Sequence, residues 1–208
     1  LKDYPHAAVD THGQRRSVRL ELRDDEIRLD IVPAVARKGL DYPLRVPDRP
    51  QREWIPSDPL GYAKRLSALN QANGDKLVPL VKLMKGWRDE HMIYRRPKSY
   101  VLEVILFYAV EDWALVLSDR SVAQNVHDAF VHITGKYQDL MDSGSEAPRI
   151  PDPQVPGAFI TRGWERSHFE TFMARAREAR RAAERALEAD DEAAAGEEWR
   201  RVFGSRWP

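Results

Sequence analysis

The chain has 208 residues, 42% of them hydrophobic and 32% charged, which excludes a disordered polypeptide and is enough for a sizeable core. Thirty-three basic residues balance 33 acidic ones, so there is no global positive field that would attract nucleic acid, although a local basic patch stays compatible with this balance. The absence of cysteine excludes a disulfide framework and a thiolate zinc site.

The sequence contains no leader-like segment and no apolar run long enough to cross a bilayer. With no cysteine, this favours a soluble protein of a reducing cytoplasm. Because the chain starts at Leu1 without a methionine, we interpret it as a fragment of a longer protein.

Apolar and charged residues alternate over residues 17–22 and 26–31, which predicts a β-hairpin. Two aspartates separate the segments and are typical of a turn. Centring the turn on them places Arg19 opposite Asp30 on the polar face. Asp30 is therefore a candidate functional carboxylate, but a simple cross-strand ion pair explains it as well.

Residues 36–59 are rich in proline, arginine and aspartate, which predicts short extended pieces joined by turns. Asp58 and Pro59 then match an N-cap followed by proline at the first helical position. The helix that begins there is expected to end at the Asn-Gly pair of residues 73–74.

The next two helices carry the candidate ligand-binding residues. An apolar stripe leaves Lys85 near the polar side of the first helix, and this stripe comprises Leu77, Leu80, Val81, Met84 and Trp87. Ser99 and Tyr100 open the second helix, whose residues 101–110 are apolar on all sides. The second helix is therefore predicted to lie in the core, with Ser99 at its start.

The remaining chain predicts an amphipathic helix over residues 119–141, a long proline-containing loop and a last helix from about 166 to 195. Two aromatic residues four apart, at 199 and 203, suit docking of the tail onto the body. Arginines crowd one part of the last helix, which we interpret as a solvated face: Arg177, Arg180, Arg181 and Arg185.

Several short segments resemble, in order and spacing, the bacterial nucleotidyltransferases similar to cyclic GMP-AMP synthase (CD-NTases), within the polymerase-β-like superfamily. The resemblance extends from about residue 16 to the end of the chain. The segments are Leu29-Asp30-Ile31-Val32-Pro33-Ala34, Trp54-Ile55-Pro56-Ser57-Asp58-Pro59, residues 70–74 with the following Lys85 helix, Lys98-Ser99-Tyr100-Val101-Leu102-Glu103, and residues 199–208.

This resemblance implies an α+β fold in two parts. Residues 1–57 would form the carboxy-terminal part of a nucleotidyltransferase palm with antiparallel strands, and residues 58–208 a mainly α-helical lobe that closes the nucleotide cleft. In the family an acidic pair follows a Gly-Ser turn, but neither precedes Asp30 here. The amino-terminal catalytic segment is therefore expected to be missing.

By the same resemblance, Asp30 would be catalytic as the third metal carboxylate, Lys85 and Ser99 would contact the donor triphosphate, and Tyr100 would stack on a base. A lysine suits phosphate, a helix start favours anions, and a tyrosine ring can stack on a purine. Simpler explanations exist for each: Ser99 as an N-cap, Tyr100 as a core or rim aromatic, and Lys85 as a solvated helix residue.

The resemblance implies that the intact enzyme joins ATP, GTP or another NTP into a cyclic or linear oligonucleotide messenger, with Mg²⁺ or Mn²⁺ as cofactor and release of pyrophosphate. It also implies antiphage signalling of the CBASS type, in which the messenger activates a separate effector. The chain alone is expected to be inactive. Two alternatives stay open: a nucleotidyltransferase that modifies RNA or protein, and a non-catalytic nucleotide-binding module. The histidine spacing predicts no histidine metal site.

Overall fold

The computed structural model combines helices with small antiparallel sheets, which confirms the predicted α+β class. The chain divides into two compact units, residues 1–62 and 63–208, each described by itself below. The structure describes residues 7–10, 14–22, 27–36, 43–92, 97–117 and 119–205.

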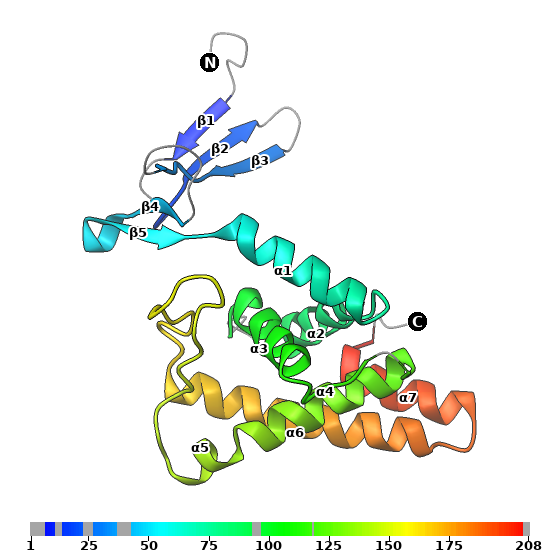
Figure 1. Ribbon diagram of the computed structural model, residues 1–208. Helices are drawn as coiled ribbons and strands as arrows, with labels where there is room; N and C mark the ends of the chain where they lie inside the picture. Colours follow the sequence, from blue (N-terminus) through cyan, green and yellow to red (C-terminus); the bar gives the residue numbers. More distant parts are fainter. Residues whose placement is uncertain are drawn as a thin grey trace. The chain divides into compact units, whose positions relative to one another are not determined.

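The described strands of the first unit form two sheets (Figure 1). A three-stranded antiparallel sheet has the order β1-β2-β3, and its register places Arg19 opposite Asp30, as predicted. The predicted turn aspartates lie outside the described residues. The strands are β1 (Ala7–Asp10), β2 (Val18–Leu22) and β3 (Ile27–Ile31), followed by β4 (Leu44–Asp48) and β5 (Glu53–Ser57), which pair through a 3-10 turn at Arg49–Gln51.

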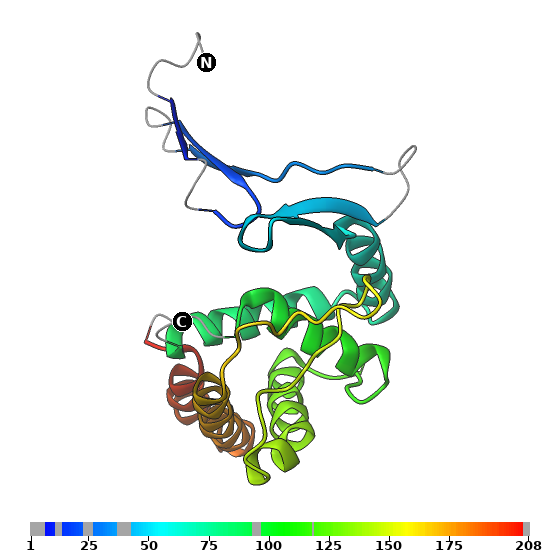
Figure 2. The same cartoon turned by 90° about the vertical axis from the view of Figure 1, so that its left-hand side faces the viewer.

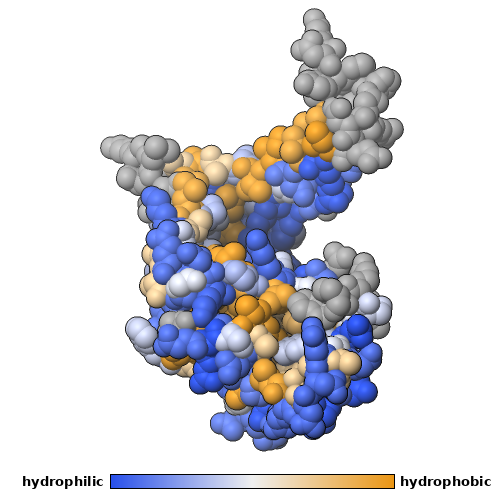
Figure 3. Space-filling view, turned by 90° about the vertical axis from the view of Figure 1, so that its right-hand side faces the viewer, coloured by the Kyte–Doolittle hydropathy of each residue, from blue (hydrophilic) through white to orange (hydrophobic). Residues whose placement is uncertain are grey.

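The apolar side chains of β3 are not covered by the described residues. Ile27, Leu29 and Ile31 are 46%, 45% and 53% exposed, whereas the residues of β2 are half-buried. Figure 3 shows hydrophobic surface over the strands of this unit. A sheet normally packs its apolar face against another layer. The alternating pattern correctly predicted the hairpin, but among the described residues nothing covers the apolar side chains of β3.

An ion pair with a buried carboxylate ties the segment before β2 to β4. The Arg15 guanidinium donates hydrogen bonds to both oxygens of the Asp48 carboxylate, from Nε to Oδ1 at 2.9 Å and to Oδ2 at 3.0 Å, and from Nη2 to Oδ2 at 2.7 Å. The Asp48 side chain is inaccessible to solvent. Its hydrogen bond with Arg15 holds the pKa of Asp48 below its ordinary value.

We expect the local stability of β4 and β5 to decrease at acidic pH. A carboxyl with a lowered folded-state pKa contributes stability above its unfolded pKa of about 3.9, and this contribution is lost as the pH falls through the folded value. Hydrogen–deuterium exchange of the strand amides between about pH 3 and 7 should show this loss, and Asp48→Asn should reduce the pH dependence. Glu53→Gln, an exposed carboxyl on β5, is the control. An unchanged pH profile in Asp48→Asn would contradict the assignment.

The second unit is helical, and α1 spans the boundary between the two units. Helix α3 is buried over most of its circumference, and the predicted apolar stripe of α2 is buried as well. Both predictions are confirmed. The helices are α1 (Pro59–Ala72), α2 (Leu77–His91), α3 (Ser99–Glu111), α4 (Val122–Lys136), α5 (Gln138–Asp142), α6 (Arg166–Glu188) and α7 (Glu192–Phe203).

Side-chain caps start several helices. The Asp58 carboxylate accepts a hydrogen bond from the Gly61 amide at 2.8 Å, which confirms the predicted N-cap. A Cβ at Gly61 would lie 2.1 Å from Oδ2 of this carboxylate, so a larger residue there would displace the capping side chain. Ser121 and Gln124 form a capping box at the start of α4. The Asn70 side-chain oxygen accepts from the Val78 amide in the first turn of α2.

The prediction of one long last helix was wrong. Helix α6 ends at Glu188, and α7 starts at Glu192, where the Asp191 carboxylate accepts a hydrogen bond from the Ala194 amide at 2.8 Å. The break lets α7 pack beside α6 (Figure 2). Helix α6 is also more than a solvated helix, because it buries one face consisting of Phe169, Phe172, Met173, Ala176, Ala179, Ala182, Ala183 and Ala186.

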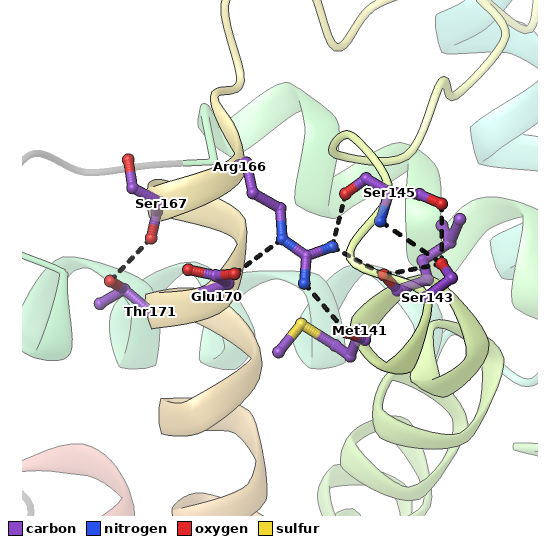
Figure 4. Close-up of polar contacts among 8 residues, drawn as sticks. Met141, Ser143, Ser145, Arg166, Ser167, Glu170 and Thr171 are labelled. Carbon is purple, nitrogen blue, oxygen red and sulfur yellow. Dashed lines mark hydrogen bonds and ion pairs between the residues drawn. The ribbon is translucent and has the colours of Figure 1, made fainter.

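Arg166 connects the start of α6 to the end of α5 (Figure 4). Its guanidinium donates hydrogen bonds to the backbone carbonyl oxygens of Leu140, Met141 and Ser145, and to the carboxylate of Glu170. The last carbonyl groups of a helix lack intrahelical donors, and these bonds supply them. Arg166 thereby anchors both ends of the loop between α5 and α6.

Candidate functional site

Asp30 lies on β3 with its side chain 43% exposed. Its Oδ1 is 3.4 Å from Nε of Arg19 on β2, and its Oδ2 is 3.6 Å from Nη2 of Arg28. The cross-strand ion pair that offered a simple explanation is thus present. Exposed pairs of this kind contribute only about 0–1 kcal/mol, so the carboxylate can exchange its arginine partners for another ligand at little cost.

The described residues do not form a magnesium site by themselves. No group of three histidine, aspartate or glutamate side chains among them is placed to hold a metal ion. Magnesium is held through carboxylate oxygens, and two-metal sites need several of them. Asp30 is a single carboxylate with two arginine neighbours, so further ligands would have to come from outside the described part of the chain.

Lys85 is held by an ion pair within the helical unit. Its Nζ donates a hydrogen bond to Oε2 of Glu103 on the adjacent helix α3. The side chains are 30% and 15% exposed, respectively, so this pair is better shielded than the pair around Asp30. Lys85 is therefore not a freely solvated residue. Its ammonium is fixed at the junction of α2 and α3 and remains partly accessible.

Glu103 was not among the predicted site residues. The signal that could have identified it is a single charged residue within the apolar stretch of residues 101–110 of α3. It lies one turn beyond Ser99, so both side chains lie on the same side of the helix. Its charge also contributes to the environment of Tyr100.

Ser99 is the first helical residue of α3 and not its N-cap. Lys98 takes the N-cap position and makes no side-chain cap. The simple explanation of Ser99 as a capping residue therefore does not hold in this structure. The start of a helix presents backbone N–H groups that favour an anion, and the Ser99 hydroxyl lies in this first turn.

Tyr100 is a partly exposed aromatic residue at the rim of the helical unit. Burial raises the pKa of its phenol, and the nearby charges of Asp152 and Glu103 raise it further. The phenol therefore stays neutral at physiological pH. A neutral ring with one accessible part can stack on a base and can still donate a hydrogen bond through its hydroxyl group.

Helix α1 and the loop between α5 and α6 border α3 on the side that carries Tyr100 and Glu103. Arg65 on α1 pairs with Glu111 and donates to the backbone oxygen of Pro153 at 2.6 Å. The Tyr108 hydroxyl donates to the backbone oxygen of Pro151 at 3.4 Å. The second unit thus brings Lys85, Ser99 and Tyr100 to one polar edge around Glu103, whereas Asp30 belongs to the first unit.

Within the described residues, no helix combines the length and the apolar character that crossing a membrane requires.

No protein-family model matches the chain. Individual relatives do: the chain is 27% identical over its full length to a cyclic AMP-AMP-AMP synthase of an Acinetobacter strain, and covers 57% of that protein. It is 25% identical, over 80% of its length, to a probable cyclic AMP-AMP-GMP nucleotide synthase of Salmonella paratyphi B, and covers 43% of it. The chain therefore spans about half the length of these curated relatives.

Solved structures show the same fold. CdnC of E. coli MS115-1 with ATP matches 98% of the chain with a TM-score of 0.75 and 21% identity, and 68% of that chain is covered. The Vibrio cholerae cyclic AMP-GMP synthase DncV, in complex with nonhydrolyzable GTP, matches 99% with a TM-score of 0.73 and 14% identity, and 54% of it is covered. The chain is thus similar in sequence to cyclic oligonucleotide synthases and has the fold of CD-NTases, which confirms the predicted resemblance.

Proposed function

We propose that the chain is part of a nucleotidyltransferase that joins NTPs into a cyclic or linear oligonucleotide messenger and releases pyrophosphate. The observation that carries the proposal is the shielded Lys85–Glu103 pair beside the start of α3, where Ser99 and Tyr100 lie. A fixed ammonium, a helix start and an aromatic ring are the groups that a triphosphate and its base need. The similarity to cyclic oligonucleotide synthases along the whole chain supports it.

In this proposal Lys85 and Ser99 contact the donor triphosphate, and Tyr100 stacks on a base. Glu103 holds the lysine side chain in place before the nucleotide arrives, which reduces the conformational entropy lost on binding. Because Glu103 also neutralises part of the lysine charge, the bound triphosphate shares this ammonium with it. The NTP is ATP, GTP or another nucleotide.

We further propose that residues 1–57 belong to the catalytic palm and residues 58–208 to the lobe that closes the nucleotide cleft. Asp30 is then one catalytic carboxylate that holds Mg²⁺, or Mn²⁺ in its place, and its companion carboxylates come from a segment that precedes Leu1 in the whole protein. Such a metal ion neutralises developing phosphate charge when bound. The exposed apolar side chains of β3, which such a segment would cover, support this arrangement.

In a cell, the complete protein would act in the cytoplasm in antiphage signalling, and its messenger would activate a separate effector. This chain alone would be inactive, because a single carboxylate does not assemble the metal site. The product names of the similar synthases support the messenger.

Incubation of the complete protein with each labelled NTP and Mg²⁺ tests the proposal. A phosphatase-resistant product that forms without RNA supports a cyclic messenger. Label transferred to RNA or to a protein would instead indicate a modifying nucleotidyltransferase. Binding of NTP without any turnover would indicate a non-catalytic nucleotide-binding module.

Lys85→Ala in the complete protein is expected to raise the KM for NTP by about tenfold or more, because a hydrogen bond to a charged group contributes about 1.5–3 kcal/mol. Steady-state kinetics with each NTP measure the change. Lys82→Ala is the matched control, since this exposed lysine lies on the same helix. Circular dichroism shows whether both variants keep the fold. An unchanged KM in Lys85→Ala would remove this residue from the triphosphate site.

A further inference from the structure

Three arginines of α6 line a hollow next to the end of α4. The hollow has a volume of about 450 Å³ and lies entirely within the second unit. None of the residues proposed to bind the NTP lines it. Its lining residues are Thr134 and Gly135 of α4, Gln138 of α5, and Arg177, Arg180, Arg181 and Glu184 of α6.

The spacing along α6 explains this grouping. Residues 177, 180, 181 and 184 follow at intervals of three and four, so their side chains lie along one side of the helix. The neighbouring side is buried against the unit's core. The arginines are therefore held next to α4 and α5. Their segment of α6 forms one wall of a concave surface.

Within the described part of the chain, no ion pair compensates the charges of these three arginines. Among the described residues, none of Arg177, Arg180 and Arg181 has a carboxylate oxygen within 4 Å, and Arg177 donates to the neutral side chain of Gln138 at 2.9 Å. Glu184 is the one acidic lining residue. Other arginines of α6 and α7 do form ion pairs: Arg166–Glu170, Arg175–Glu178, Arg185–Glu198, Arg200–Glu197 and Arg201–Glu198.

These arginines differ from the other arginines of α6 and α7 in having no ion-pair partner among the described residues. Like charges held together on a folded surface repel one another, whereas the neighbouring arginines avoid this by pairing. The volume falls within the range of small-ligand sites, about 300–1,000 Å³. Guanidinium groups bind phosphate through paired hydrogen bonds, and a phosphate chain is long enough to reach several of them.

We propose that this hollow binds a small ligand that carries two or more phosphate groups, separately from the NTP site at α2 and α3. The three arginines bind the phosphate oxygens, and Gln138 orients Arg177. Gly135 leaves room for the ligand, since a Cβ built there meets no atom within 4 Å. The inference depends on these residues alone and not on the proposed enzymatic activity.

Titration of inorganic tripolyphosphate into the complete protein, followed by calorimetry at physiological ionic strength, tests the proposal. The experiment uses the Lys85→Ala background, so that the proposed NTP site does not dominate the signal. Arg180→Gln with Arg181→Gln should weaken binding at least about tenfold. Gly135→Leu should also weaken it by filling the hollow. Arg175→Gln, which removes an exposed arginine of the same helix, should leave the affinity unchanged.

Comparing several ligands distinguishes a nucleotide from a bare phosphate chain, and it also shows which results would contradict the proposal. Tighter binding of ATP than of tripolyphosphate would identify a nucleotide, equal binding would identify the phosphate chain alone, and both support the site. Binding that is insensitive to the arginine pair and to Gly135→Leu would overturn the proposal. So would equal binding of sulfate, or binding of a nucleic-acid duplex with no binding of either polyphosphate.

Discussion

Asp30→Asn in the complete protein is expected to abolish nucleotide joining while leaving the fold intact. The substitution removes the negative charge that would hold a divalent cation, and losing that stabilisation of transition-state charge is expected to lower the rate at least about 100-fold. The stability should change little, because the two ion pairs of Asp30 are long and solvent-exposed. Formation of labelled product and thermal unfolding of the same preparation measure both effects.

Glu21→Gln is the matched control for this experiment. Glu21 is a carboxylate on the neighbouring strand β2 of the same sheet, and no role in the metal site is proposed for it. It should keep full activity. Parallel loss of stability and activity in Asp30→Asn would favour the ion-pair explanation of this residue, and full activity would exclude Asp30 from catalysis.

Trp87→Ala is expected to lower the free energy of unfolding of the helical unit by about 3–5 kcal/mol. Trp87 is fully buried, and its ring packs edge-on against Phe130 and Phe172 at centroid distances of 4.9 and 5.7 Å. Its removal loses apolar contacts from α4 and α6 at once and leaves a cavity. A loss of this size is a large share of the total stability of a typical domain, about 5–15 kcal/mol.

Urea unfolding followed by circular dichroism measures this loss, with Trp113→Ala as the control. Trp113 is 81% exposed, so its truncation removes few contacts and should change the stability by less than about 1 kcal/mol. A similar small change in both variants would contradict the central packing role of Trp87.

The packing of Trp87 also affects the candidate site. Trp87 and Lys85 are two residues apart on α2, so their side chains leave the helix in nearly opposite directions. Burial of the tryptophan therefore turns the lysine toward Glu103 and the partly accessible edge of the unit. A loosened core in Trp87→Ala would release this orientation, which would link stability to the nucleotide binding proposed for Lys85.

Much of the local structure could be predicted because it depends on residues close in sequence. Alternation of apolar and charged residues predicted the hairpin and its register, and the apolar stripe predicted the buried face of α2. Asp58 was recognised as a cap because proline follows it at the first helical position, and the amide it caps lies only three residues away. The break before α7 was missed, although Asp191 is a cap of the same local kind.

Motif order along the chain was enough to recognise the resemblance to CD-NTases, which implied the α+β class and the residues worth testing. The folded chain was needed to find that Lys85 pairs with Glu103, 18 residues away, and that Lys98 takes the cap position beside Ser99. It also revealed that three arginines of α6 border a hollow formed with α4 and α5. The ion pair and the hollow arise where separate helices meet, and such contacts depend on how the helices pack rather than on the pattern within any one of them.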